Sequence, residues 1–269
     1  MNSSTTWSWT WDETLYAGSA EHYAAGRRPY PAALADVIRD ELGLDGTGRL
    51  LDVGCGPGSL TTLLAPLFAA AVGVDADPGM IEVARRSAPA IGWHCLRAEE
   101  LPGGLGRFRV MSFAQSFHWM DQPVVARAAR DMLDPGGAWV HVAAMTHRGD
   151  EDEDPLWEAI DRLIRSYLGP VRRAGRGVLP TGTRAGEEDV MRAAGWQGPV
   201  RREIRQGVVT RTLDQMVSAV FSLSGSTAHQ FGDRSPAFER DLRDLLLAIA
   251  PEGRFSQRQG PIEVVIWRP

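Results

Sequence analysis

The alternation of short apolar runs with amphipathic stretches restricts the fold of this chain more than any other feature. The run "RLLDVG" leads into a glycine-rich turn, the helix-like "SLTTLLAPLF" and a second apolar run, "AAVGVD". The pattern continues through a helix-like "PGMIEVARRS" and the runs "IGWHCL", "RFRVMSFA" and "AWVHVAAM", the last one preceded by a turn at "DPGG". These repeats predict an α/β fold with five parallel strands and helices on both faces of the sheet.

The flanking segments extend this core. Residues 1–45 contain the helix-like "YPAALADVIRDELG", which is expected to stop at Gly43. After residue 150, "PLWEAIDRLIRSYL", "TLDQMVSAVF" and "FERDLRDLLLAIA" have helical periodicity, "IEVVIW" is typical of a strand, and "REIRQGVVT" predicts one more. The prediction is one domain over residues 1–269: N-terminal lid helices (1–45), a ligand-binding core (46–150), and helical cap elements with the last strands (151–269). The cap helices either only cover the sheet or also close a substrate pocket.

Composition excludes several classes of function. All 29 basic residues are arginine, so a Schiff-base lysine and a phosphate-loop lysine are both excluded. A net charge of -5 offers no bulk attraction to nucleic acid or to an anionic membrane, and a small-molecule partner fits better. Cys55 and Cys95 are too few for a disulfide framework. No signal-like start and no membrane-spanning run is seen, which predicts a cytoplasmic protein. A monomer or homodimer is expected, and the sequence does not distinguish the two.

The glycine turn after the first strand is the strongest motif. Gly54, Gly56 and Gly58 let the backbone turn sharply and approach a ligand, at the edge where doubly wound sheets bind ligands. The dinucleotide fingerprint needs a third glycine where this chain has Ser59, which weighs against NAD. Asp75 ends the second strand and could accept hydrogen bonds from a ribose diol in either cofactor class. An NAD-dependent oxidoreductase therefore remains an alternative.

Five ordered motifs carry a resemblance to a known family. "LLDVGCGPG", "VGVDADPGM", "RAEELP", "FAQSFHWMD" and "LDPGG" resemble class I S-adenosylmethionine-dependent methyltransferases, in the small-molecule branch with a His-Trp pair after the fourth strand. The resemblance implies a Rossmann-like, doubly wound, seven-stranded, mostly parallel sheet, with S-adenosyl-L-methionine as cofactor and S-adenosyl-L-homocysteine as product. It implies methylation of an O or N, less readily a C, of a small apolar or aromatic metabolite, as in secondary-metabolite tailoring. A relative that binds the cofactor without transferring its methyl group is a further alternative.

The resemblance also implies which residues bind the cofactor. Asp75 would hold the ribose hydroxyls, while Ala76 and Met80 would pack on the adenine. Arg97 stands where many relatives carry Asp or Thr, which leaves the contact to the exocyclic amine open, and Arg28 replaces a proline of the family's N-terminal pattern. The full expected set is Tyr23, Arg27, Gly54, Gly56, Gly58, Asp75, Ala76, Met80, Ala98, Glu99, Ala114 and Gln115.

The stretch after the fourth strand and the N-terminus supply the substrate-site hypotheses. Phe117, His118 and Trp119 are expected in the substrate pocket, ahead of a helix that Asp121 caps. His118 is a candidate general base, or else it orients its loop, and His147 is a second candidate base. The alternating tryptophans of "WSWTWDETLY" predict either a packed tail or a lid that brings Trp11 to the pocket. No His, Asp or Glu spacing predicts a metal site.

Overall fold

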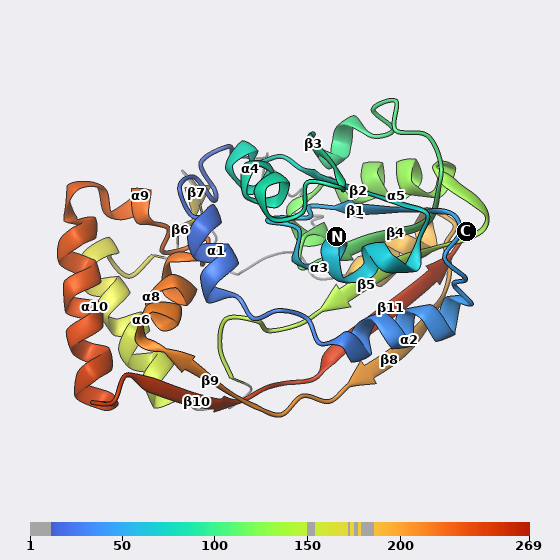
Figure 1. Cartoon of the computed structure of the whole chain (residues 1–269). Helices are drawn as coiled ribbons and strands as arrows, with labels where there is room; N and C mark the ends of the chain where they lie inside the picture. The colour runs from blue at the N-terminus through green and yellow to red at the C-terminus, as the bar shows by residue number, and fades with distance from the viewer. Residues whose placement is uncertain (1–11, 150–153, 172, 175–176, 179–185) are drawn as a thin grey trace, which may run out of the picture.

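A seven-stranded sheet with helices on both sides carries the fold (Figure 1). The structure is a computed structural model and describes residues 12–149, 154–171, 173–174, 177–178 and 186–269. The main strands are β1 (Arg49–Val53), β2 (Ala70–Asp75), β3 (Gly92–Cys95), β4 (Phe108–Ala114), β5 (Leu133–Ala143), β8 (Gln197–Ile204) and β11 (Ile262–Arg268). The α-helices are α1 (Ala20–Gly26), α2 (Ala32–Leu42), α3 (Ser59–Leu64), α4 (Pro78–Ser87), α5 (Gln122–Asp131), α6 (Pro155–Leu168), α7 (Glu187–Ala193), α8 (Leu213–Phe221), α9 (Ala228–Phe231) and α10 (Ser235–Ile249).

The strand order is β3-β2-β1-β4-β5-β11-β8. The first five strands in this order pair in parallel, whereas β11 is antiparallel to both β5 and β8. The chain order reverses at β1, which lies between β2 and β4. Doubly wound sheets bind ligands at the carboxyl ends of the strands beside such a switch point. The mostly parallel seven-stranded sheet is as predicted.

Both faces of the sheet are buried, so neighbouring residues on a strand belong to opposite cores. Leu50 packs with α2 and α3 on one face, while Leu51 packs with α5 and α7 on the other. Val140 and Trp139 divide in the same way on β5. This arrangement explains why the strands are continuous apolar runs rather than alternating ones.

The cap has a hydrophobic core of its own, formed by α6, α8, α9 and α10. It is joined to the sheet by the two-stranded ribbon of β9 (Val208–Thr212) and β10 (Arg254–Arg258), which extends from β8 and β11 toward the helices (Figure 1). Helix α1 packs closely on α8, because a Cβ atom at Gly26 would lie 2.2 Å from the backbone nitrogen of Ala219. The N-terminal segment therefore contacts the cap as well as the core.

Two predicted boundaries are wrong. The "DPGG" stretch is not a separate turn but part of β5, where the pairing with β4 shifts between Phe108 and Val110, and Gly136 has a φ of +75°. The predicted strand in "REIRQGVVT" is two strands, β8 and β9, in different sheets. Within the described ranges, no helix is long and apolar enough to cross a membrane.

Candidate functional site

The glycine turn is fixed by hydrogen bonds to the end of β2. The amide groups of Gly54 and Cys55 both donate to the carbonyl oxygen of Val74, at 2.8 and 3.0 Å. The amide of Gly56 donates to Asp75 Oδ2 at 2.8 Å. Gly54 and Gly56 have φ values of +67° and +54°, which only glycine adopts without strain. The turn therefore lies against the carboxylate that ends the next strand.

A cavity opens at this turn, and we call it the turn cavity. Every residue expected to bind the cofactor lines it, except Arg27 and Gly58. Its volume is about 80 Å³, smaller than the roughly 300–1,000 Å³ of typical ligand pockets. The rings of Tyr16, Tyr23 and Trp119 lie in its wall. The lining residues are Tyr16, Tyr23, Gly54, Gly56, Asp75, Ala76, Met80, Arg97, Ala98, Glu99, Ala114, Gln115, Ser116, Trp119 and Met120.

Two acidic residues lie under this cavity with different roles. Burial raises the pKa of both Asp52 and Asp75 to about 6. Asp52 accepts hydrogen bonds from Thr61 and Ser112, at 2.6 and 2.7 Å, and ties β1 to its neighbours. Asp75 accepts from the amides of Gly56 and Asp77, one on each carboxylate oxygen. Since each oxygen can accept a second bond, Asp75 keeps capacity for the two hydroxyls of a diol.

Glu99 and Gln115 form part of the wall of the turn cavity. Glu99 accepts a hydrogen bond from the amide of Asp121 at 2.9 Å, and Asp121 caps α5 as predicted. Gln115 has a φ of +53° and is the only described residue other than glycine with a positive φ. Strained residues of this kind concentrate at functional sites. Gln115 also lines a second cavity, so this strained residue lies where the two cavities meet.

The second cavity, the cap cavity, lies between the ends of β4 and β5 and helix α6. It measures about 500 Å³ and shares Tyr16, Tyr23, Gln115 and Trp119 with the turn cavity. Its other walls come from the loop after β5, from α6 and the residues after it, and from the loop before α9. They consist of Arg27, His118, Met145, His147, Arg148, Asp161, Ile164, Arg165, Leu168, Gly169, Pro170, Val171, Leu223, Ser224, Gly225 and Ser226.

Gly58 and Arg27 are the two expected cofactor residues that do not line the turn cavity, and each has another role. A Cβ atom at Gly58 would lie 2.4 Å from the ring of Trp93, so this glycine serves packing rather than ligand approach. Arg27 lies in the cap cavity, with its guanidinium 4.6 Å from the centroid of the Tyr23 ring. It donates hydrogen bonds to Ser222, Thr146 and His147, so most of its donors are already engaged within the protein.

The residues expected in the substrate pocket do not all lie in one cavity. His118 and Trp119 line the cap cavity, with ring centroids 5.1 Å apart. Phe117 does not line it: it is 1% exposed and packs against Phe113 and Trp139, because the short 3-10 helix Phe117–Trp119 turns it into the sheet core. The expectation for Phe117 is therefore corrected. Trp11 lies outside the described residues.

His147 lines the cap cavity but does not fit the role of a base. Arg27 Nη1 lies 3.1 Å from His147 Nδ1, and since arginine only donates, Nδ1 must accept. The proton of the neutral ring is then on Nε2, so neither nitrogen is free to take up another. Burial, followed by the charges of Arg27 and Arg148, lowers the pKa of His147 well below its usual value. The hypothesis of a catalytic His147 is set aside.

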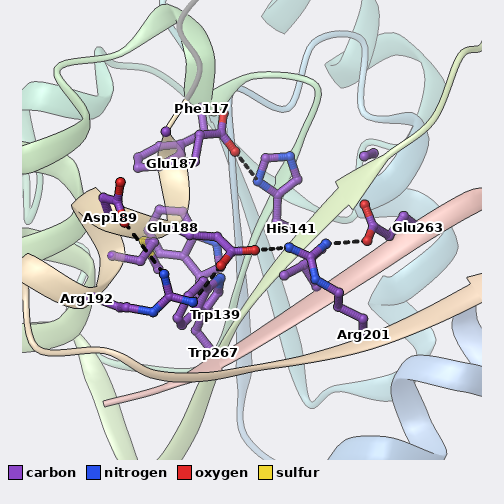
Figure 2. Close-up of a pocket in the computed structure, with 14 residues that line it drawn as sticks. Phe117, Trp139, His141, Glu187, Glu188, Asp189, Arg192, Arg201, Glu263 and Trp267 are labelled. Atoms are coloured by element: carbon purple, nitrogen blue, oxygen red, sulfur yellow. Dashed lines mark hydrogen bonds and ion pairs between the residues drawn. The ribbon is translucent and has the colours of Figure 1, made fainter.

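A third cavity, the β5–β11 cavity, lies on the face of the sheet covered by α7 (Figure 2). At about 560 Å³ it is the largest of the three, yet Phe117 is the only expected site residue in it. His141 Nδ1 and Glu187 Oε2 are 3.3 Å apart there, and Arg201 bridges Glu188 and Glu263. Burial lowers the pKa of His141 to about 4 and raises that of Glu187. The ion pairs link α7 to the sheet, away from the glycine turn.

Sequence reasoning missed several residues of both cavities. Ser116 and Met120 lie inside the motif "FAQSFHWMD" and could have been inferred from their neighbours. Tyr16 belongs to the aromatic N-terminal stretch, in which only Trp11 was singled out. The α6 residues carry no motif at all and show only helical periodicity. Among the residues that the structure describes, no group of three or more His, Cys, Asp or Glu side chains could hold a metal ion.

Comparison with known proteins finds similarity in the core of the chain. Residues 50–137 match the methyltransferase domain family. An uncharacterised methyltransferase of Mycobacterium tuberculosis is 35% identical over 131 residues, which are 47% of this chain and 51% of the relative. The ubiquinone biosynthesis O-methyltransferase of Cereibacter sphaeroides is 39% identical over 97 residues, 34% of this chain and 39% of the relative. The chain spans about half the length of the first curated relatives it matches.

Solved structures extend the likeness to the whole fold. A candidate type II methyltransferase from Anaeromyxobacter dehalogenans superposes with a TM-score of 0.52 at 22% identity, over 89% of this chain and 95% of that one. The [4+2]-cyclase SpnF superposes with a TM-score of 0.50 at 19% identity, over 90% of this chain and 84% of that one. These structures show the same overall fold, and the family match covers residues 50–137.

Proposed function

We propose that the protein is an S-adenosylmethionine-dependent methyltransferase acting on an oxygen or nitrogen of a small apolar or aromatic molecule. The observation that carries the proposal is the junction of two cavities: a turn cavity with an acidic residue suited to a ribose diol, and a larger cap cavity that shares four of its residues. The family match over residues 50–137 and the O-methyltransferase relative support the same reaction class.

The residues of the turn cavity fit the proposed cofactor chemically. Asp75 has acceptor capacity for two hydroxyls, and the missing side chain at Gly56 allows a close approach to the backbone. Ala76, Met80 and Ala98 offer an apolar surface for a purine. When bound, S-adenosylmethionine supplies a methyl group on a sulfonium whose departure leaves a neutral thioether, so no oxyanion hole is needed.

The protein's contribution is then alignment and proton removal. Orienting two reactants can supply up to roughly 7–11 kcal/mol of the barrier reduction. Tyr16, Tyr23 and Trp119 lie where the cavities meet and would exclude water from the reacting atoms. His118 is the remaining histidine candidate for the base, since it lines the cap cavity next to Trp119 and His147 is set aside.

A turnover screen tests the proposal. The protein is incubated with methyl-labelled S-adenosylmethionine and small aromatic alcohols, phenols and amines, and both the labelled product and S-adenosylhomocysteine are quantified. The proposal expects the two to form in equal amounts.

A second candidate is a protein that binds the cofactor without transferring its methyl group. One fact favours keeping it: the [4+2]-cyclase SpnF has a similar fold. This alternative expects the substrate to be converted without any S-adenosylhomocysteine, which the same screen detects.

A further inference from the structure

The cap cavity has an excess of positive charge in its wall. Among the described residues of its wall, Arg27, Arg148 and Arg165 are accompanied by one carboxylate, Asp161. Asp161 and Arg165 are one turn apart on α6, a spacing that often forms an ion pair, but none joins them. Over the described part of the chain, no carboxylate lies within 4.0 Å of any of the three guanidinium groups. Among the described residues, the positive charge of this wall therefore has no carboxylate partner.

Two buried arginines that contact the loop after β5 add to this positive charge. Arg28 donates hydrogen bonds to the carbonyl oxygens of Met145 and Arg148, and Arg211 donates to that of Thr146, so both hold the loop after β5. Burial lowers the pKa of each to about 10, which leaves both charged at neutral pH. Arg28 Nη1 is buried without a hydrogen-bond partner among the described residues. Charges in such low-dielectric surroundings are weakly screened, so they strengthen the positive potential at the cavity wall.

The arginines differ in what they can still bind. Arg27 uses four of its five N–H groups on Ser222, Thr146 and His147. Arg148 uses its Nε on the sulfur of Met145, and its terminal nitrogens make no hydrogen bond with a described residue. Arg165 makes no side-chain hydrogen bond with the described residues at all. A ligand anion therefore finds its donors on Arg148 and Arg165.

We propose that the cap cavity binds a carboxylate of the substrate through Arg148 and Arg165. Guanidinium groups bind carboxylates by paired, charge-assisted hydrogen bonds. Ile164, Leu168 and Leu223 provide apolar wall for the body of the same molecule. Its reacting oxygen or nitrogen then lies toward Gln115 and Trp119, where the cavity meets the turn cavity. The inference rests on the proposed function and specifies its substrate class as a small aromatic or apolar carboxylic acid.

Benzoate and benzamide test this inference, because they share a shape and differ in charge. Each is titrated into the protein saturated with S-adenosylhomocysteine, with binding followed by ligand-observed NMR. Benzoate is expected to bind at least tenfold more tightly than benzamide, and added salt should weaken only benzoate. The double variant Arg148→Gln/Arg165→Gln should abolish the preference. Arg162→Gln is the matched control, because Arg162 lies on the same helix, 70% exposed and outside the cavity wall.

Equal binding of the two probes, binding of neither, or a preference that survives in the double variant overturns the inference. Thermal unfolding of each variant checks that these exposed substitutions leave the fold intact. The same benzoate titration is repeated without S-adenosylhomocysteine. If S-adenosylhomocysteine itself fails to bind, the proposed function fails, and the benzoate preference of the unliganded protein is still read out separately.

Discussion

Arg27 Nη1 lies 3.1 Å from His147 Nδ1, and this contact determines which nitrogen of the imidazole carries the proton. The same arginine reaches Ser222 at the end of α8 and stacks on Tyr23 of α1. One side chain thus links the N-terminal helix, the loop after β5 and the cap, next to the cavity proposed for the substrate.

This contact predicts that the pKa of His147 lies well below that of a free histidine. Its buried ring is surrounded by arginines, which oppose a second positive charge. Two-dimensional NMR of the histidine side chains measures this directly. In Arg27→Met the pKa of His147 should rise, and the free energy of unfolding should fall by at least about 1.5 kcal/mol, because hydrogen bonds of a charged group are lost. A His147 titration near its usual pKa in the unmodified protein would contradict the assigned tautomer.

The raised pKa of Asp75 predicts that cofactor binding depends on pH. Burial lifts this pKa to about 6, so below pH 6 the carboxyl group is protonated in the free protein and accepts hydrogen bonds poorly. Diol hydroxyls favour the ionised form, so the affinity for S-adenosylhomocysteine should rise with pH through 6 and level off above it. The steepest slope is about tenfold per pH unit for one linked proton. In Asp75→Asn this affinity should not depend on pH. If the pH dependence persists in Asp75→Asn, another group than Asp75 is responsible for it.

Gly56→Ala should abolish binding of S-adenosylhomocysteine while costing little stability. The new Cβ atom meets nothing closer than 4.0 Å, but the φ of +54° is strained for alanine by about 1–2 kcal/mol, and the methyl group enters the cavity wall. Gly104→Ala is the matched control, because its φ is +74° and nothing lies within 4 Å. Equilibrium dialysis and thermal unfolding should show equal stability losses and a binding loss in Gly56→Ala only. Intact binding in Gly56→Ala would mean that the ligand does not approach this turn.

His118→Ala should lower kcat more than it weakens cofactor binding, if His118 is the base. The pH profile of kcat should then lose an ionisation, and His118→Gln should not restore it. His147→Gln is the comparison, since its profile should keep that ionisation. A uniform fall in rate together with weaker cofactor binding would instead assign His118 to holding the loop.

The turn cavity was predictable because its residues adjoin strand ends in contiguous motifs. A glycine turn after β1 and an acidic residue at the end of β2 meet in any doubly wound sheet, whatever the rest of the chain does. Phe117 was mispredicted because the short helix there directs neighbouring residues to opposite sides, and the sequence does not show which one faces the core. Arg148 and Arg165 were not predicted at all. They meet only through the packing of α6 against the loop after β5, for which helical periodicity contains no signal.

Isothermal titration of S-adenosylmethionine, with NAD titrated in parallel, tests the central claim most directly. We expect one equivalent of S-adenosylmethionine to bind to the unmodified protein, strong weakening in Asp75→Ala, and no heat with NAD. Binding of NAD without binding of S-adenosylmethionine would contradict it.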